Sequence, residues 1–329
     1  MEERKNLDTR ASALMVLLCM VLGLQQVVLK IAAPDISPIM QIALRSGLSA
    51  VLVLPLLWRD HSIHLFSYRQ CKAGALVALF FSLEFYFVTQ ALKFTSTSHT
   101  VVLLYTAPIF VALGLHWKFP TERLNRAQWG GIALAFMGII LTFYPTTTAT
   151  NAPALAQVLL GDLYALMAGL AWALSTIIVR LSPLAQAPAT QTLFYQLFGC
   201  FVLLLLIAFL TNQTTIHFTT LAILSLSFQT LIVSFASLLL WFWLLRNYLA
   251  SRLGIFSFLT PLFGVLFSIL LLEEKLEIKF IFGSILVLSG IVIMSLKQGK
   301  ANSSQALTLV EYYFSSKIVE SGIESFAAK

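Results

Sequence analysis

Charged residues are scarce in this sequence. The 329 residues include 21 Lys or Arg and 14 Asp or Glu, together 11% of the chain, whereas 59% are hydrophobic. A soluble domain carries about 25% charged residues, because its surface must be polar. The deficit excludes a soluble enzyme. The net charge of +7 would suggest nucleic acid as a partner of a soluble protein, but most basic residues here fall in short loops, so no nucleic-acid partner is expected.

Cysteines and catalytic motifs are also scarce. Cys19, Cys71 and Cys200 lie within or beside apolar runs, which indicates small buried residues and neither disulfides nor a metal site. There is no His-Glu-x-x-His, no nucleotide-binding glycine loop and no Gly-x-Ser-x-Gly, so no catalytic residue, metal or cofactor is expected. The lack of an ATP-binding motif favours a secondary carrier over a pump. The alternatives from another class are a pore and a membrane-embedded enzyme, with Glu84 and His99 as a weak catalytic pair.

Long hydrophobic runs are abundant. Several reach 18 residues or more, the length that a membrane-spanning helix requires. Turns rich in Pro and Ser separate the runs. The pattern predicts an all-α integral membrane protein with ten transmembrane helices, near residues 11–33, 38–58, 71–93, 97–118, 125–144, 158–182, 189–210, 220–245, 249–272 and 278–296.

The basic residues orient these helices. If the N-terminus is inside, sixteen Lys and Arg lie in the inner segments, and only Lys30, Lys93, Lys275 and Lys279 lie at the outer ends. Because cytoplasmic loops carry the excess of Lys and Arg, both termini are expected in the cytoplasm, in a multi-pass protein of the plasma (bacterial inner) membrane. Residues 297–329 are expected to form a cytoplasmic tail, either disordered, which we favour, or folded as a short amphipathic helix.

The two halves of the chain are similar to each other. At offsets of 150 to 153 residues, positions of the first half match positions of the second, as Pro108 matches Pro261. The repeats, 11–144 and 158–296, each contain five predicted helices, and because five is odd, the second repeat enters the membrane inverted. Inverted repeats are typical of secondary transporters, in which the substrate site lies near the midplane and one half rocks against the other.

Pro108 and Pro261 lie inside predicted helices four and nine. Each proline frees the carbonyl group four residues earlier, at Leu104 and Ser257. A free carbonyl group in hydrocarbon is costly unless it faces protein or a water-filled cavity. We interpret the two prolines as hinges of cavity-lining helices that bend when access switches; a static packing kink is the alternative.

Glycines recur seven residues apart in predicted helices five and ten, as Gly131 and Gly138 and as Gly283 and Gly290. Small residues on one helix face allow another helix to approach closely. We expect this face to pack within the monomer rather than to form a dimer seam, and the sequence leaves monomer and homodimer open.

These motifs resemble the drug/metabolite transporter superfamily, specifically its EamA-type members with ten spans. The resemblance covers about 11–144 and 158–296. It implies a plasma-membrane carrier, often an exporter of amino acids or related small metabolites. It rests on the two proline helices, the glycines of the last helix in each half, Glu122-Arg123-Leu124, Glu274-Lys275-Leu276, Gly23 through Lys30, and Ala43-Leu44-Arg45.

The second repeat departs from the first at two of these positions. Tyr195 stands where the first repeat has Arg45, and Ala173 stands where it has Gly23. We therefore do not expect the two halves to bind ligand in the same way.

Ionisable residues inside the membrane are costly, so each suggests a function. Arg45 and Glu84 lie about 10 and 14 Å from the outer ends of their predicted helices. Gln25, Gln26 and Tyr105 fall at a similar depth, which predicts a polar substrate pocket. Glu84 would pair there with Arg45 or with a substrate ammonium group, and its protonation would couple export to proton entry. The alternative is a structural Glu84–Arg45 ion pair.

Four further residues are candidates for substrate contact: Tyr86, Gln90, Trp172 and Tyr195. Tyr86 and Gln90 are four residues apart and share a helix face. Trp172 lies in the middle of its predicted helix, where it would stack on a substrate or pack in the core.

Polar residues at the outer mouth are expected to have ordinary roles. Lys30 and Lys93 would extend toward the membrane interface, and His99 would be a satisfied polar residue at a helix start. Asp162 is expected to be interfacial, with a gate as the alternative. The loop carboxylates are expected to be solvated: Glu273, Glu274 and Glu277.

Together these features predict a secondary transporter that exports a small zwitterionic or amphipathic metabolite by alternating access. Both proton coupling and simple facilitation are compatible with the sequence. The expected partners are a small-molecule substrate and the lipid bilayer. A carrier for organic or nucleotide-linked anions is the alternative, because basic residues gather at the predicted outer mouth.

Overall fold

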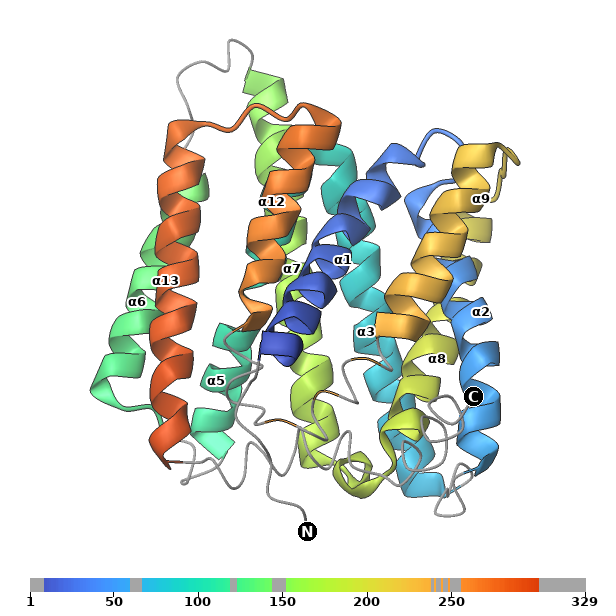
Figure 1. Ribbon diagram of the computed structural model, residues 1–329, viewed down its shortest axis with the longest axis horizontal. Helices are drawn as coiled ribbons and strands as arrows, with labels where there is room; N and C mark the ends of the chain where they lie inside the picture. The colour runs from blue at the N-terminus through green and yellow to red at the C-terminus, as the bar shows by residue number, and fades with distance from the viewer. Residues whose placement is uncertain are drawn as a thin grey trace.

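The computed structural model describes residues 9–59, 67–118, 123–143, 152–237 and 256–301, with Leu240, Leu244 and Tyr248. Helices run side by side as a bundle (Figure 1). An isolated antiparallel bridge joins Ile36 and Ile216. The elements are α1 (Thr9–Ile31), α2 (Pro38–Arg59), α3 (Tyr68–Phe94), α4 (Thr97–Leu104), α5 (Ala107–Lys118), α6 (Arg126–Phe143), α7 (Ala152–Leu181), the 3-10 helix η2 (Pro183–Gln186), α8 (Ala189–Leu210), α9 (Thr220–Ser227), the π-helix η3 (Phe228–Ala236), α12 (Leu259–Leu272) and α13 (Ile278–Ala301).

The helices have the length and composition of membrane spans. Six are long and apolar enough to cross a bilayer, namely α1, α2, α3, α4 taken with α5, α7 and α8. Four shorter apolar helical segments accompany them: Arg126–Thr142, Thr220–Ala236, Leu259–Leu272 and Ile278–Met294. The chain is therefore an all-helical, multi-pass membrane protein.

Most predicted helix boundaries agree with the structure, and α8 matches its predicted range, 189–210, at both ends. α13 continues to Ala301, past the predicted end at 296. The rest of the predicted tail, 302–329, lies outside the described residues, as do parts of the predicted helices 220–245 and 249–272.

α6 and α13 pack against each other at one side of the bundle (Figure 1). A Cβ atom on Gly131 would lie 2.7 Å from the Gly290 oxygen, and one on Gly138 would lie 2.6 Å from the Gly283 oxygen. Because these neighbours are backbone atoms, any side chain would force the helices apart. The prediction that these glycines pack within the chain is confirmed.

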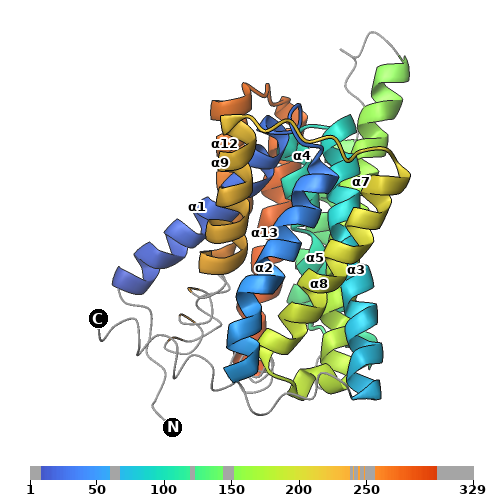
Figure 2. The same cartoon turned by 90° about the vertical axis from the view of Figure 1, so that its right-hand side faces the viewer.

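The other helices pair across the two halves of the sequence. α1 packs on α12, α7 packs on α3, α4 and α5, and α2 packs on α8 (Figure 2). The α1–α12 contact is close, because a Cβ atom on Gly23 would lie 2.8 Å from the Gly264 nitrogen. The buried interior is therefore built from residues of both halves.

Predicted helix four is interrupted just before Pro108. α4 ends at Leu104 and α5 begins at Ala107. The Leu104 carbonyl oxygen faces α7, 2.9 Å from where a Cβ atom of Gly169 would lie. The Thr106 hydroxyl donates to the Leu103 carbonyl oxygen at 2.6 Å. The carbonyl group that Pro108 leaves without a donor thus faces protein rather than lipid.

A similar interruption precedes Pro261. A turn at Phe258 separates the helical residues 256–257 from α12. Phe258 lies three residues before Pro261, as Tyr105 lies three residues before Pro108. The two prolines therefore follow interruptions of their helices at matching positions. The hinge role of Pro108 and Pro261 stays a prediction.

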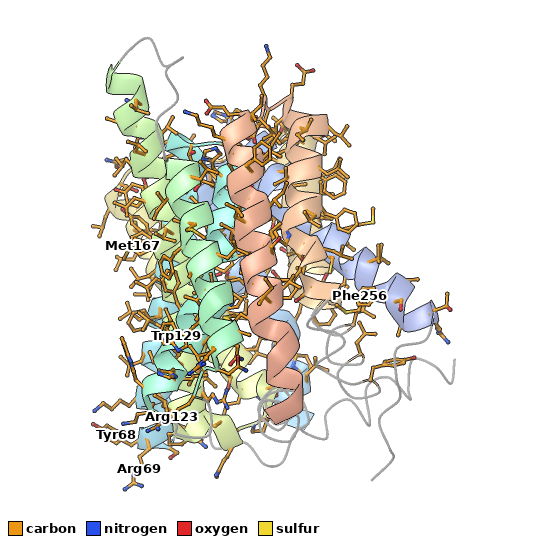
Figure 3. The ribbon with its side chains drawn as sticks, turned by 90° about the vertical axis from the view of Figure 1, so that its left-hand side faces the viewer. Tyr68, Arg69, Arg123, Trp129, Met167 and Phe256 are labelled. Atoms are coloured by element: carbon orange, nitrogen blue, oxygen red, sulfur yellow. The ribbon has the colours of Figure 1, made fainter. Side chains whose placement is uncertain are left out.

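The two ends of the bundle differ in charge. We call "outer" the end where α1 ends and α13 begins, and "inner" the end where α1 begins and α13 ends (Figure 1). Arg69 and Arg123 lie toward the inner end, with Tyr68 beside them (Figure 3). These names follow the predicted topology, in which basic residues gather on the cytoplasmic side.

Candidate functional site

Arg45 of α2 lies inside the bundle and is 4% exposed. Its Nη1 donates to Gln229 Oε1 at 2.7 Å, and its guanidinium group lies 4.6 Å from the centre of the Phe85 ring. When the Gln25 amide is oriented to suit its neighbours, its oxygen also accepts from Arg45 Nη1, at 2.8 Å. We call Gln25, Arg45, Phe85 and Gln229 the arginine cluster; it joins α1, α2, α3 and η3.

Gln229 was not predicted as a site residue. It is fully buried, and its Nε2 donates to the Gln25 backbone oxygen at 2.9 Å. It lies in the π-helix η3, a rare local structure that is frequent at functional sites. Gln25 was singled out because it is an amide inside an apolar predicted span. The same criterion, applied to the predicted span 220–245, would have identified Gln229.

Glu84 is buried beside the arginine cluster and is 7% exposed. Its Oε2 has no hydrogen-bond partner among the described residues. The ion pairs of the described residues do not include the expected Glu84–Arg45 pair, so the structural-pair alternative is not supported. The reason is geometric: the guanidinium group is engaged by two amides and an aromatic ring. Arg45 Nε is also buried and has no partner in the described part of the chain.

Aromatic side chains adjoin the arginine cluster. Tyr105, at the break between α4 and α5, meets Trp172 of α7 edge to face, with ring centres 5.4 Å apart. Both rings and Tyr86 pack on the apolar group that contains Phe85. Five predicted site residues, Gln25, Arg45, Glu84, Tyr105 and Trp172, thus lie around one buried region, with Tyr86 at its edge.

Gln26, Gln90 and Tyr195 are the remaining predicted site residues. Gln26 is buried and its Oε1 has no partner among the described groups, and Gln90 is half-buried. Tyr195 lies among other residues: its hydroxyl is 3.7 Å from Cys71 Sγ, and its ring covers Gly74. The prediction that Tyr195 shares the pocket of Arg45 is not supported, because α8 starts at the inner end of the bundle and α2 at the outer end (Figure 1).

Glu274, on the loop after α12, corrects an expectation. It was expected to be solvated, but its side chain is 11% exposed. Its two carboxylate oxygens accept from the backbone nitrogens of Thr97 and Ser98 at 2.6 and 3.0 Å. The Ser98 hydroxyl donates to it at 2.8 Å, and Lys30 Nζ lies 3.4 Å away. A carboxylate of the second half therefore caps the first turn of α4.

These contacts set the charge of Glu274. Burial acts to raise its pKa, but the N–H groups of Thr97 and Ser98, the Ser98 hydroxyl and the Lys30 charge outweigh burial and hold the pKa below its ordinary value of 4.5. The positive end of the α4 dipole also favours a carboxylate there. Glu274 is therefore ionised at neutral pH.

Asp162 is a second carboxylate with partners at the outer end. It is 1% exposed. It accepts from Thr95 Oγ1 at 2.6 Å, and both of its oxygens lie 2.9 Å from His99 Nδ1. The His99 ring stacks on Phe280 with ring centres 4.2 Å apart. Asp162 thus joins α7 to the start of α4.

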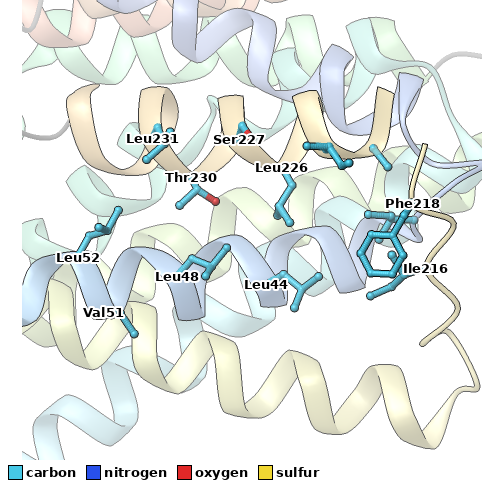
Figure 4. Close-up of a pocket in the computed structure, with 13 residues that line it drawn as sticks. Leu44, Leu48, Val51, Leu52, Ile216, Phe218, Leu226, Ser227, Thr230 and Leu231 are labelled. Atoms are coloured by element: carbon cyan, nitrogen blue, oxygen red, sulfur yellow. The ribbon is translucent and has the colours of Figure 1, made fainter. Parts of the chain in front are cut away.

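An apolar groove lies between α2 and the α9–η3 segment (Figure 4). It encloses about 390 Å³ and is lined mainly by Leu, Ile, Val and Phe, with Ser227 and Thr230 as polar members. Several lining residues are strongly exposed, such as Val51 at 62% and Phe218 at 81%. The groove therefore opens to the lipid face and does not suit a zwitterion, in contrast to the buried region around Arg45 and Glu84.

Apolar helices around buried ionisable and amide side chains are typical of a membrane transport protein. The chain belongs to the EamA-like transporter family, whose model matches residues 9–144 and 159–296. This membership places it in the drug/metabolite transporter superfamily, as the sequence resemblance implied. The family and the names of its relatives point to a transporter and not to an enzyme.

Relatives from several bacteria are similar over most of their length. The "uncharacterized transporter YoaV" of Bacillus subtilis is 24% identical, over 82% of this chain and 91% of that protein. A "probable amino-acid metabolite efflux pump" of Escherichia coli is 25% identical, over 87% of this chain and 95% of that protein. A solved crystal structure shares the fold, with a TM-score of 0.58 at 15% identity, and the match covers 90% of this chain and 99% of that one.

Proposed function

We propose that this protein is a secondary transporter of the bacterial plasma membrane that exports amino acids or related small metabolites by alternating access. The name of the E. coli relative, "probable amino-acid metabolite efflux pump", supports this substrate class. The lack of an ATP-binding motif supports a secondary carrier. The proposal includes ten spans in two inverted repeats, residues 11–144 and 158–296, with both termini in the cytoplasm.

The helix packing supports the inverted repeat. In the order of the ten proposed spans, the counterpart of each span in the first repeat comes five spans later. When every span is exchanged for its counterpart, the α6–α13 contact is unchanged, and so is the α2–α8 contact. The α1–α12 contact maps onto that of α7 with α4 and α5. An internal twofold axis in the membrane plane produces this exchange, and it relates two halves that rock against each other.

The observation that carries the proposed site is a pair of buried ionisable groups, each with an atom that makes no hydrogen bond among the described residues. These atoms are Glu84 Oε2 and Arg45 Nε. A buried polar atom without a partner costs free energy, and a ligand that supplies the partner removes this cost. A zwitterion matches both groups, with its ammonium group at Glu84 and its carboxylate at Arg45. Gln25, Gln26, Tyr86, Gln90, Tyr105 and Trp172 would line the site.

Proton coupling follows from the same arrangement. Glu84 can hold either a proton or the substrate ammonium group, so substrate release on one side and protonation on the other would exchange the two. Simple facilitation is the alternative within this proposal.

The anion-carrier alternative loses the observation on which it rested. Three basic side chains at the outer end face oxygen atoms of the protein. Lys30 lies by Glu274, His99 by Asp162, and Lys93 Nζ donates to Gln213 Oε1 at 3.1 Å. These three side chains are therefore engaged within the chain.

Counterflow in proteoliposomes tests the proposal. Vesicles loaded with one unlabelled amino acid at a time should accumulate the labelled form of a transported one, with saturation; a linear, unsaturable flux would indicate a pore. Glu84→Gln should lower the flux at least about tenfold and remove its pH dependence, and Glu84→Asp should restore part of both. Glu273→Gln, which neutralises an exposed loop carboxylate, is the control. Unchanged flux and pH dependence in Glu84→Gln would exclude Glu84 from the mechanism.

A further inference from the structure

At the outer end of the bundle, the start of α4 is held by a contact with another part of the chain. α4 is a helix of only eight residues, and the backbone N–H groups of Thr97 and Ser98 in its first turn donate to Glu274, which is 177 and 176 residues away in sequence. The Ser98 hydroxyl also meets the hydroxyl of Ser268 on α12. The start of α4 is therefore fastened to the second half of the chain.

The other end of α4 adjoins the proposed substrate site. Its C-cap is Tyr105, whose ring meets Trp172 beside the arginine cluster. The break at residues 105–106 separates α4 from α5, so α4 is a short rigid segment with one fastened end and one end at the site. A movement at either end is transmitted to the other, because the hydrogen bonds within a helix keep its length fixed.

We propose that Glu274 holds an outer gate closed by capping α4, and that release of α4 from Glu274 opens the substrate site to the outer side. Lys30 and the His99–Asp162 pair support the closed position, because both lie at the same end of α4. The break before Pro108 is the point about which α4 turns. This inference rests on the proposed function, since a gate has meaning only for a carrier with alternating access.

A purely structural cap is the competing explanation, and accessibility distinguishes the two. Ser268 is fully buried next to Ser98, so Ser268→Cys places a thiol directly behind the gate. A membrane-impermeant maleimide added to right-side-out vesicles reaches this thiol only when the outer end opens. Cys19 and Cys200 are buried, and the parent chain without the new thiol gives the background labelling.

In the Ser268→Cys chain, Glu274→Gln should speed labelling about tenfold, because the equilibrium shifts toward the open state. Glu273→Gln on the same loop should leave the rate unchanged. Equal labelling rates in the Glu274→Gln and Glu273→Gln chains would overturn the proposal, even if Glu274→Gln lowered the thermal stability, because the carboxylate would then be a structural cap only.

A reversible lock gives a second test that keeps Glu274 intact. The Ser98→Cys and Ser268→Cys pair replaces two hydroxyls in mutual contact. Two-electron oxidation of the thiol pair by copper phenanthroline and oxygen, with loss of both thiol protons, should form a bridge and slow counterflow at least about tenfold. Reduction should restore it, and each single variant should be insensitive to oxidation. Transport that continues with the bridge formed, as verified by mass spectrometry, would overturn the gate alone, whereas absence of saturable flux in the unmodified chain would overturn the proposed function.

Discussion

The outer and inner ends of the bundle are held together by different chemistry. At the outer end, carboxylates accept from groups of other helices, as Glu274 does from α4 and Asp162 from Thr95. At the inner end, the contact of α3 with α8 is between neutral groups, such as Gln191 Nε2 and Gln70 Oε1 at 3.1 Å. Hydrogen bonds to an ionised group are about twice as strong as neutral ones. The difference indicates that these contacts at the outer end are the stronger ones, which agrees with the proposed export from the cytoplasm.

The closely packed α6–α13 pair is part of the scaffold that supports both ends of the bundle. Gly138→Ala places a methyl group against the Gly283 oxygen and the Val287 nitrogen, so it should lower the free energy of unfolding by about 1–3 kcal/mol. Gly130→Ala is the matched control, because a Cβ atom there meets nothing within 4 Å. Thermal unfolding in detergent measures both. Similar melting temperatures for the two variants would contradict the close packing.

The contrast between the ends predicts unequal effects of two conservative changes. Asp162→Asn removes the charge that accepts from Thr95 and faces His99, and should cost about 1–3 kcal/mol. Tyr195→Phe at the inner end removes a neutral hydroxyl and should cost less than about 1 kcal/mol. Thermal unfolding of the two proteins under one condition gives the difference. A larger loss for Tyr195→Phe would reverse the comparison.

The stability that Glu274 contributes should be insensitive to pH over the neutral range. Because the pKa of Glu274 is lowered, the stability that its charge contributes is complete above its unfolded pKa and declines as the pH falls through the lowered value. The difference in melting temperature between the wild type and Glu274→Gln should stay constant from about pH 8 to pH 5 and shrink below that. Comparing the two proteins at each pH removes the contributions that they share. A difference that disappears near neutral pH would show that the carboxylate is not held in its charged form.

Lys30 should have the smallest effect. Its side chain is 30% exposed and its Nζ lies 3.4 Å from Glu274, so the pair is screened by solvent. Lys30→Gln should change the free energy of unfolding by less than about 1 kcal/mol. Thermal unfolding at low and high salt checks this, and a loss equal to that of Glu274→Gln would mean that the ion pair, and not the cap on α4, carries the contact.

The sequence predicts the helices well because long apolar runs leave few other structures in a bilayer. It also predicts that Gln25 and Arg45 lie at a similar depth in the membrane, because depth follows from the number of residues to the end of a helix. It does not predict that Gln229 meets Arg45, because the partner of a side chain on another helix depends on how the helices rotate about their axes.

Glu274 shows a second limit of sequence reasoning. A carboxylate on a short loop is ordinarily solvated, and nothing near Glu274 in sequence indicates its partner. Only the packing of the two halves brings the start of α4 to it. Glu84 is the opposite case. Arg45, at a similar depth, was the expected partner of Glu84, but the Arg45 guanidinium group donates to amide oxygens instead.

The π-helix η3 has a consequence for the symmetry of the two halves. Its hydrogen bonds span five residues instead of four, so each turn accommodates one residue more than an α-helix. Along η3, the side chains therefore point in other directions than they would in an α-helix such as α3. Duplicated halves can in this way diverge in what they present to the interior while keeping the same number of crossings, and a symmetric scaffold can enclose an asymmetric binding chamber.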